Sequence, residues 1–195
     1  MALPQITRTS LGATALRGPF SEYLNADESA VLIALVRRVQ PRVMVEIGIA
    51  SGLTARRLLE HVPTLEAYYG VDVPDDFVTT LRCQQSEVQR VPGRWAYHDP
   101  RFHLVVRPQG SLEILSMLSD ELGQVDAVFI DGDHSYNAVM HDSDTAAKLI
   151  RPGGVVIWHD YLNPGVQVTA ALEALLAAGW PMQHVAGTWL AFAQF

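Results

Sequence analysis

Short apolar runs alternate with segments of helical spacing, and this alternation constrains the fold of the chain more than any other feature. Apolar runs that predict strands lie at 43–48, 67–73, 102–106, 125–130 and 155–158. Helical patterns lie at 30–39, 51–61, 75–90, 111–122, 135–150 and 166–178. Runs that are apolar at almost every position are typical of strands buried on both faces. The alternation therefore predicts a parallel, doubly wound, Rossmann-like α/β sheet with helices on both faces.

The C-terminal end departs from this alternation. Residues 182–185 and 188–192 flank the dipeptide Ala186-Gly187, which is a signal for a β-hairpin. We expect these two segments to add an antiparallel hairpin to the edge of the sheet. Plain dinucleotide-binding sheets usually end on a parallel strand, so the hairpin is a distinguishing addition.

Composition limits the classes of partner and the location. The chain has 195 residues, of which 49% are hydrophobic and 18% charged, and this composition predicts one globular domain. We place the domain at 25–195. The N-terminal segment 1–24 is expected to be flexible or to cover the site. A net charge of −7 disfavours nucleic acid. No apolar run reaches membrane-spanning length. A lone cysteine, Cys83, and the lack of a signal-peptide pattern favour the cytoplasm.

Ionisable residues gather where the predicted strands end. In an open parallel sheet, ligands bind outside the carboxyl ends of the strands. In this sequence those ends carry Glu46, Asp72, Gly110-Ser111, Asp131-Gly-Asp-His134 and His159-Asp160. Because buried ionisable groups are rare unless they have partners, we expect a functional site along this edge.

The first strand runs into the pattern Glu46-x-Gly48-x-x-x-Gly52 and then a helix. Glycines allow a tight turn and a close approach to a ligand, and the helix N-terminus offers free N–H groups. The pattern is not the G-x-G-x-x-G of nicotinamide enzymes. Asp72 follows at a distance typical of an acid that binds a ribose diol. The alternatives are a tight turn without a ligand and an Asp72 that caps the next helix.

Four segments together carry a family resemblance. They are Val45-Glu-Ile-Gly-Ile-Ala-Ser-Gly52, Gly70-Val-Asp72, Phe129-Ile-Asp-Gly-Asp-His-Ser-Tyr136 and Arg151-Pro-Gly-Gly-Val-Val-Ile-Trp-His-Asp160. The chain resembles the class I S-adenosylmethionine-dependent methyltransferases over roughly residues 25–195. It is most similar to the branch that includes small-molecule O-methyltransferases. The resemblance implies a seven-stranded sheet of order 3-2-1-4-5-7-6 with strand seven antiparallel.

The resemblance also implies a set of cofactor-binding residues. They are Glu46, Gly48, Ile49, Ala50, Ser51, Gly52, Asp72, Gly110, Ser111 and Asp131. The Gly48–Gly52 loop would hold the methionine part of S-adenosylmethionine, with Glu46 beneath it. Asp72 would bind the ribose, Gly110 and Ser111 would border the adenine, and Asp131 would stand beside the transferred methyl group. The implied reaction is methylation of a small-molecule acceptor at a hydroxyl.

Asp131, His134 and Asp160 are the predicted catalytic residues. Asp131 and Asp160 end neighbouring predicted strands, whose backbones lie about 5 Å apart, so their carboxylates could share Mg²⁺ or a similar ion. The resemblance makes His134 a general base, with or without the metal. Tyr161 follows Asp160 where the catechol-type members have Asn, so the third metal ligand stays open among Asp133, His159 and Asn163. The structural alternative is that these residues cap a helix and order a turn.

Two other functions compete with methyl transfer. A nicotinamide-dependent oxidoreductase is disfavoured because Asp144, and not Tyr, precedes the single lysine, Lys148, at the Tyr-x-x-x-Lys spacing. A cofactor-binding module without catalysis is disfavoured by the intact set of Asp131, His134 and Asp160. Association of the chain with itself as a homo-oligomer is left open.

Overall fold

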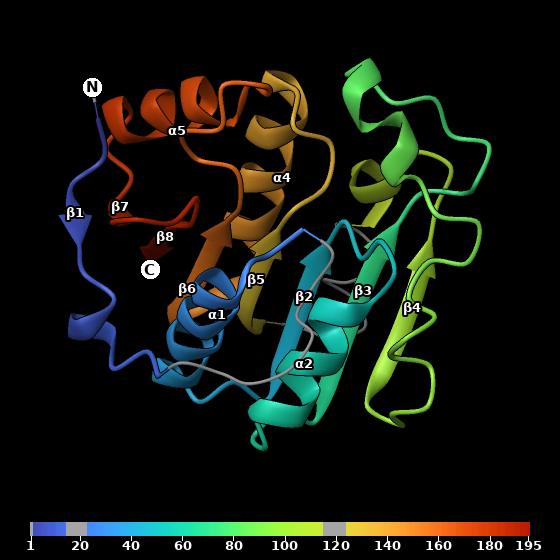
Figure 1. The fold of residues 1–195 in the computed structure, drawn as a ribbon, viewed down its shortest axis with the longest axis horizontal. Helices are drawn as coiled ribbons and strands as arrows, with labels where there is room; N and C mark the ends of the chain where they lie inside the picture. Colours follow the sequence, from blue (N-terminus) through green and yellow to red (C-terminus); the bar gives the residue numbers. More distant parts are fainter. Residues whose placement is uncertain (1, 15–22, 115–123) are drawn as a thin grey trace.

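The part of the chain that this computed structural model describes, residues 2–14, 23–114 and 124–195, contains a mixed sheet of eight strands (Figure 1). The strands are β1 (Gln5–Ile6), β2 (Val43–Ile47), β3 (Ala67–Asp72), β4 (Phe102–Val106), β5 (Val125–Ile130), β6 (Ile150–Trp158), β7 (Met182–Val185) and β8 (Ala191–Gln194). Their order is β1-β7-β8-β6-β5-β2-β3-β4, and only β8 runs antiparallel to its neighbours. With β2 counted as strand one, strands β2 to β8 have the predicted order 3-2-1-4-5-7-6. The predicted fold class is confirmed.

The structure adds one strand to the seven that were expected. β1 pairs in parallel with β7, and Ile6 lies opposite Val185 (Figure 1). Two residues are too few to show the alternation by which a strand is recognised in sequence. Part of the segment 1–24 therefore belongs to the sheet, whereas residues 15–22, for which a cover over the site was expected, lie outside the described residues.

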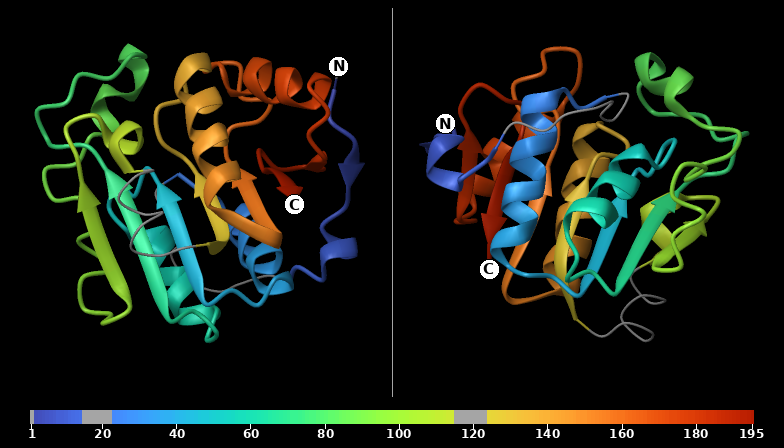
Figure 2. Two further views of the ribbon diagram at one scale, coloured as in Figure 1. Left: turned by 180° about the vertical axis from the view of Figure 1, so that it is seen from behind. Right: turned by 60° about the horizontal axis from the view of Figure 1, so that its bottom comes forward.

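Helices cover both faces of the sheet, as the views from behind and from below also show (Figure 2). The helices are α1 (Ala26–Arg38), α2 (Leu53–His61), α4 (Tyr136–Leu149) and α5 (Val168–Ala177). Leu32 of α1 and Leu58 of α2 share one buried cluster with Phe129 of β5, and Val139 of α4 shares the other with Val128 of the same strand. Successive residues of β5 thus face opposite layers, which explains its continuous apolar run.

α1 begins four residues before the predicted pattern 30–39, at a capping box formed by Asn25 and Glu28. The Asn25 side chain accepts hydrogen bonds from the N–H groups of Asp27 and Glu28, and the Glu28 carboxylate accepts one from the N–H of Asn25. This reciprocal capping box satisfies N–H groups that the first turn leaves without partners. It also fixes the Glu28 side chain, which reaches the functional site described below.

The predicted helix over 75–90 is wrong. The connection from β3 to β4 contains one 3₁₀ helix, η2 (Arg82–Glu87), and Phe102 then starts β4. The segment lacks an apolar stripe to bury, and the side chain of Val78 is 80% exposed. A polar helix without an apolar face gains little from tertiary packing.

Two further segments bear on the predicted helices over 111–122 and 135–150. Gly110–Glu113 forms the 3₁₀ helix η3, and residues 115–123 of the first predicted helix lie outside the described residues. The segment 151–154, between the second predicted helix and the predicted strand 155–158, belongs to β6, at a register shift in its pairing with β5. Among the described helices, none is both long and apolar enough to cross a membrane.

Candidate active site

A cavity of about 490 Å³ lies outside the carboxyl ends of β2, β3, β5 and β6. Open parallel sheets bind their ligands at this edge. Most of the predicted site residues reach its wall: Gly48, Ala50, Asp72, Gly110, Ser111, Asp131, His134 and Asp160. The connection between β3 and β4 also contributes to the wall, through residues that include Phe77, Gln84 and Glu87.

Four predicted cofactor residues do not line the cavity. Glu46 is buried beneath the loop, where its carboxylate accepts a 2.6 Å hydrogen bond from the Tyr68 hydroxyl. Burial raises the pKa of Glu46 well above its usual range. Ile49 packs in the core beside Gly70, Ser51 is buried, and Gly52 stands at the N-cap of α2. These four residues therefore support the loop after β2 on its side away from the cavity.

The loop after β2 packs directly on the end of β5. Gly48 has a φ of +89°, and a Cβ on this residue would lie 2.2 Å from the carbonyl oxygen of Asp131. Asp72 fixes the other side of the loop, because its carboxylate accepts hydrogen bonds from the N–H groups of Ala50 at 2.8 Å and Val73 at 2.7 Å. Burial raises the pKa of Asp72 to about 6. The close approach thus requires glycine at position 48.

A carboxyl that sequence reasoning missed faces Ser111. The Ser111 hydroxyl donates a hydrogen bond to Asp142, which lies on α4 and also lines the cavity. Burial raises the pKa of Asp142 to about 7. The sequence did hold a signal for Asp142, because it lies on the same helical face as the apolar positions Val139 and Ala146. A carboxyl at a buried position seldom lacks a functional or structural partner.

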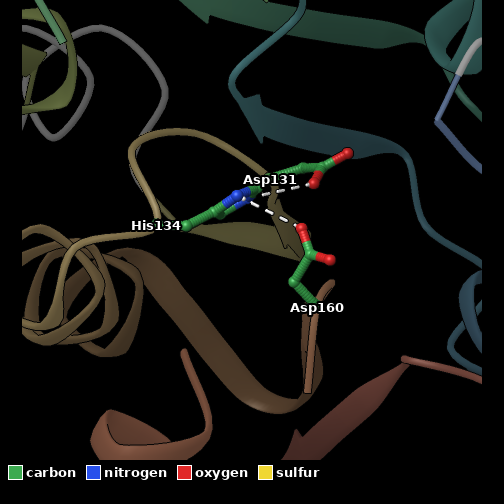
Figure 3. Close-up of side chains that lie close together, drawn as sticks. All are labelled: Asp131, His134 and Asp160. Atoms are coloured by element: carbon green, nitrogen blue, oxygen red, sulfur yellow. Dashed lines mark ion pairs between the residues drawn. The ribbon is translucent and has the colours of Figure 1, made fainter. Parts of the chain in front are cut away.

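Asp131, His134 and Asp160 converge, as predicted from the strand ends (Figure 3). Asp131 follows β5 and Asp160 follows β6, and these strands are paired neighbours. His134 Nε2 lies 3.3 Å from Asp131 Oδ1, and His134 Nδ1 lies 3.2 Å from Asp160 Oδ2. One ligand atom from each residue can be chosen so that all lie within 4.8 Å of one another. The three side chains therefore form one polar group with a cluster geometry that suits a metal or a proton transfer.

The charges in this group reinforce one another. Burial alone would raise the pKa of Asp131, but the neighbouring His159 and His134 imidazoles lower it to about 2. Burial opposes protonation of His134, yet the carboxylates of Asp131 and Asp160 raise its pKa. Negative charge within hydrogen-bonding distance thus outweighs desolvation and favours an imidazolium at this position.

Gln84 fixes the ring of His134, and no sequence pattern indicated it. Its Oε1 accepts the backbone N–H of His134 at 2.9 Å, so its Nε2 is the atom that faces His134 Nδ1 at 2.8 Å. The same Nε2 donates to the carbonyl of Gly132 at 3.1 Å. In a neutral ring Nδ1 therefore carries the lone pair and Nε2 the proton.

His159 forms a second imidazole beside the carboxylates. Its Nδ1 lies 3.1 Å from Asp131 Oδ1 and 3.4 Å from Asp160 Oδ2, and its Nε2 lies 3.8 Å from Glu28 Oε2. Burial disfavours the charged form, but these carboxylates raise the pKa of His159 well above its usual range. Glu28 was not predicted, because it reaches the site from the first turn of α1, far away in sequence.

The remaining metal-ligand candidates have separate partners. Asn163 donates a 2.6 Å hydrogen bond to Asp160, whose backbone has a φ of +63°. A left-handed conformation at a residue other than glycine is often found at functional sites. Asp133 accepts the N–H of Ser135 at 2.8 Å, at the start of α4. The side chains of Asp133 and Gln167, whose Oε1 accepts the N–H of Tyr136 at 2.8 Å, thus bond this helix start, whereas those of Asp131 and His134 do not.

A family model described as a methyltransferase domain matches residues 45–161. The match spans more than half of the chain and includes the loop after β2, Asp72 and the group of Asp131, His134 and Asp160. The chain therefore belongs to this methyltransferase family, and the predicted resemblance is confirmed. No curated protein sequence matches the chain.

Solved structures of methyltransferases share the fold. An O-methyltransferase from Bacillus cereus in complex with SAH has a TM-score of 0.62 at 18% identity, over 90% of this chain and 84% of that chain. TomG, an O-methyltransferase from Streptomyces achromogenes in complex with SAM, has a TM-score of 0.60 at 21% identity, over 88% of this chain and 80% of that chain. MycE, a methyltransferase of mycinamycin biosynthesis in complex with Mg, SAH and mycinamycin VI, has a TM-score of 0.57 at 18% identity, over 89% of this chain and 50% of that chain.

Proposed function

We propose that the protein is an S-adenosylmethionine-dependent methyltransferase that methylates a hydroxyl group of a small-molecule acceptor. The observation that carries this proposal is that the glycine loop, Asp72 and the group of Asp131, His134 and Asp160 line one cavity. The family match supports methyl transfer rather than the hydride transfer of a nicotinamide enzyme. The neighbours with bound SAM or SAH support the choice of cofactor.

The cavity wall offers a complement to each part of the cofactor. The backbone at Gly48 leaves room for the methionine part, and the carboxyl of Asp72 suits a ribose diol. Gly110 and Ser111 lie where the adenine would be bordered. The carboxylate of Asp131 provides the negative charge that a sulfonium favours.

The chain also supplies the groups that methyl transfer requires. The acceptor oxygen must stand in line with the methyl–sulfur bond and must lose its proton. The neutral imidazole of His134 takes this proton, and the carboxylates of Asp131 and Asp160, at 3.3 and 3.2 Å from its ring nitrogens, stabilise the imidazolium that forms. The oxygen–carbon bond forms as the carbon–sulfur bond breaks, which leaves neutral S-adenosylhomocysteine and the proton on His134. Gln84 keeps the ring in place.

The residues present fit a divalent cation as well. Asp131 and Asp160 offer carboxylate oxygens. His134 Nε2, a buried atom that lacks a hydrogen-bond partner within the described part of the chain, would be the third ligand in the tautomer that carries its proton on Nδ1, beside Asp160 Oδ2. Carboxylate and imidazole ligands suit Mg²⁺ or a similar ion. When bound, such an ion would lower the pKa of the acceptor hydroxyl and orient its oxygen. His159 and Asn163 stand beside the two carboxylates as further candidate ligands.

Titration calorimetry with S-adenosylhomocysteine tests the cofactor. We expect binding to the wild type, and a melting temperature that rises with ligand, because a ligand at a hundred times its Kd stabilises the folded state by about 2.7 kcal/mol. Asp72→Ala should bind more weakly, since it loses the ribose acceptor and the support of Ala50. Asp76→Asn, at an exposed position of the next connection, is the matched control. Binding of NAD without binding of S-adenosylhomocysteine would overturn the proposal.

Titration with Mn²⁺, as a paramagnetic substitute for Mg²⁺, tests the metal. We expect one site in the wild type, lost in Asp131→Asn and Asp160→Asn because each variant removes a charged ligand. Asp144→Asn, on the exposed side of α4, should bind as the wild type does. Full methyltransferase activity in the presence of a chelator would reject the metal and leave His134 as the only base.

Three further predictions from the sequence are carried forward as part of this proposal. The acidic composition and the size of the cavity favour a small molecule over nucleic acid. A cytoplasmic location stays a prediction, and association of the chain with itself as a homo-oligomer stays open. The third function considered, a binding module without catalysis, is disfavoured by the cluster of His134 with two carboxylates.

A further inference from the structure

Carboxylates dominate the charged groups in the cavity wall. They are Asp72, Glu87, Asp131, Asp133, Asp142 and Asp160, and the wall also holds the imidazoles of His134 and His159. Among the described residues, no lysine or arginine side chain lines the cavity. Even with both imidazoles protonated and two of the carboxyls neutral, the protein wall keeps two negative charges before the sulfonium of the cofactor or a divalent cation is counted. A potential of this sign attracts cations and repels anions.

Most of these carboxylates already have partners in the protein. Asp131 and Asp160 face the two imidazoles, and Asp72, Asp133 and Asp142 accept hydrogen bonds from backbone N–H groups or from a hydroxyl. The cavity is also more than a cluster of acids, because the buried Nε2 of His134 lies in its wall and lacks a hydrogen-bond partner in the described ranges. The wall therefore contains a buried ring nitrogen whose hydrogen-bonding capacity is not used within the described protein.

Glu87 differs from the other carboxylates. It lies in η2, it is half-buried, and its carboxylate oxygen accepts a long hydrogen bond of 3.3 Å from Gln84. Burial raises the pKa of Glu87, and the charges of Asp131 and Asp160 act on it in the same direction. Gln84 Nε2 contacts both Glu87 Oε2 and His134 Nδ1, so Glu87 lies close to the proposed transfer centre, and among the described residues no lysine or arginine contributes to the shift of its pKa.

We propose that the acceptor is a cation, a hydroxyl compound that carries an amine, and that Glu87 is the counter-ion of its ammonium group. This inference rests on the proposed function. An acceptor with a phosphate or a carboxylate would be repelled by the carboxylates of the cavity wall, which costs affinity. An ammonium group would instead pair with a carboxylate that has no cation in the described protein. Glu87 is thus a specificity-determining residue.

Binding of two cofactor analogues tests the charge preference without knowledge of the acceptor. Sinefungin carries a protonated amine where S-adenosylmethionine carries its methyl group, whereas S-adenosylhomocysteine is neutral there. We expect sinefungin to bind the wild type about tenfold more tightly, and Glu87→Gln to lose most of this preference while its affinity for S-adenosylhomocysteine changes less than about twofold. Asp76→Asn removes a negative charge outside the cavity and should behave as the wild type.

Equal affinities of the wild type for sinefungin and S-adenosylhomocysteine would overturn the inference but not the proposed function. Absence of binding for both compounds would overturn the proposed function itself.

A turnover screen then tests the acceptor. Hydroxyl compounds on several scaffolds are supplied as triplets that differ only in an amine, a neutral group or a carboxylate. We expect methylation of amine members, and in Glu87→Gln an approximately tenfold loss of kcat/KM through KM. The neutral member of the same triplet should change little. Preference for the carboxylate member, or an equal loss on amine and neutral members, would show that Glu87 does not read the charge of the acceptor.

Discussion

At the scale of single residues, Gly48 joins the cofactor loop to the strand that carries Asp131. A Cβ at this position would lie 2.2 Å from a backbone oxygen of Asp131 and 2.6 Å from the Cα of Gly132, and neither atom can rotate away. We expect Gly48→Ala to cost on the order of 2–4 kcal/mol in the free energy of unfolding and to abolish binding of S-adenosylhomocysteine. Urea unfolding and calorimetry measure the two effects.

Gly187 provides the matched control for this substitution. Its φ is +80°, similar to that of Gly48, but a Cβ there would meet no atom within 4 Å. Gly187→Ala should therefore cost only about 1 kcal/mol, from backbone strain alone, and leave the cofactor affinity unchanged. Similar costs for the two substitutions would mean that the contact with Asp131 does not matter.

Residues differ in how far the sequence could place them. Asp131, His134 and Asp160 were predicted to meet because neighbouring parallel strands end at one edge of a sheet. Gln84 could not be predicted, because it reaches His134 from an irregular connection 50 residues earlier, where no periodicity sets the direction of a side chain. Glu28 could not be predicted either, because it contacts His159 from the first turn of α1, far away in sequence.

At the scale of elements, β1 supports the edge of the sheet next to the site. Leu3 is buried, and its N–H donates a 3.0 Å hydrogen bond to the hydroxyl of Tyr161, the residue after Asp160. We expect removal of residues 2–7 to lower the melting temperature and to speed amide exchange in β7, whose edge would be exposed. Hydrogen exchange by mass spectrometry locates the change.

Point substitutions separate the contributions to this edge. Leu3→Ala should cost about 2–3 kcal/mol in the free energy of unfolding, because it leaves a cavity in the core. Tyr161→Phe should cost about 1 kcal/mol for the lost hydrogen bond. Gln5→Ala, at an exposed position of β1, should have little effect. Unchanged protection of β7 in the shortened chain would contradict the role assigned to β1.

Elements with a clear apolar pattern were predicted within a few residues, and those without one were not. β5 and α4 each bury a continuous surface, so their periods are visible in the sequence. The connection over 75–90 lines part of the cavity, and its sequence pattern wrongly predicted a helix. This connection carries Gln84 and Glu87, so the wall facing the proposed acceptor is the least predictable part of the site.

At the scale of the whole molecule, two buried carboxyls make stability depend on pH. Burial raises the pKa of Asp72 to about 6 and that of Asp142 to about 7, from 3.8. Between pH 4 and 7 the folded protein therefore holds protons that the unfolded chain has released. The contribution of each carboxyl to stability is full below about pH 4 and is lost as the pH rises through its folded pKa. For Asp142 the loss is on the order of 4 kcal/mol.

Asp142→Asn isolates this effect, because an amide resembles the protonated carboxyl and can still accept the hydrogen bond of Ser111. We expect the variant to be the more stable protein by about 1–2 kcal/mol at pH 5 and by about 4 kcal/mol at pH 8, because the wild-type carboxyl loses its contribution progressively as the pH rises from about 4 to its folded pKa. Asp144→Asn, on the exposed side of the same helix, should shift stability little, and equally at both pH values. An Asp142→Asn variant that is destabilised by the same amount at pH 5 and pH 8 would show that Asp142 is not held neutral, and the negative charge of the cavity would then be larger by one.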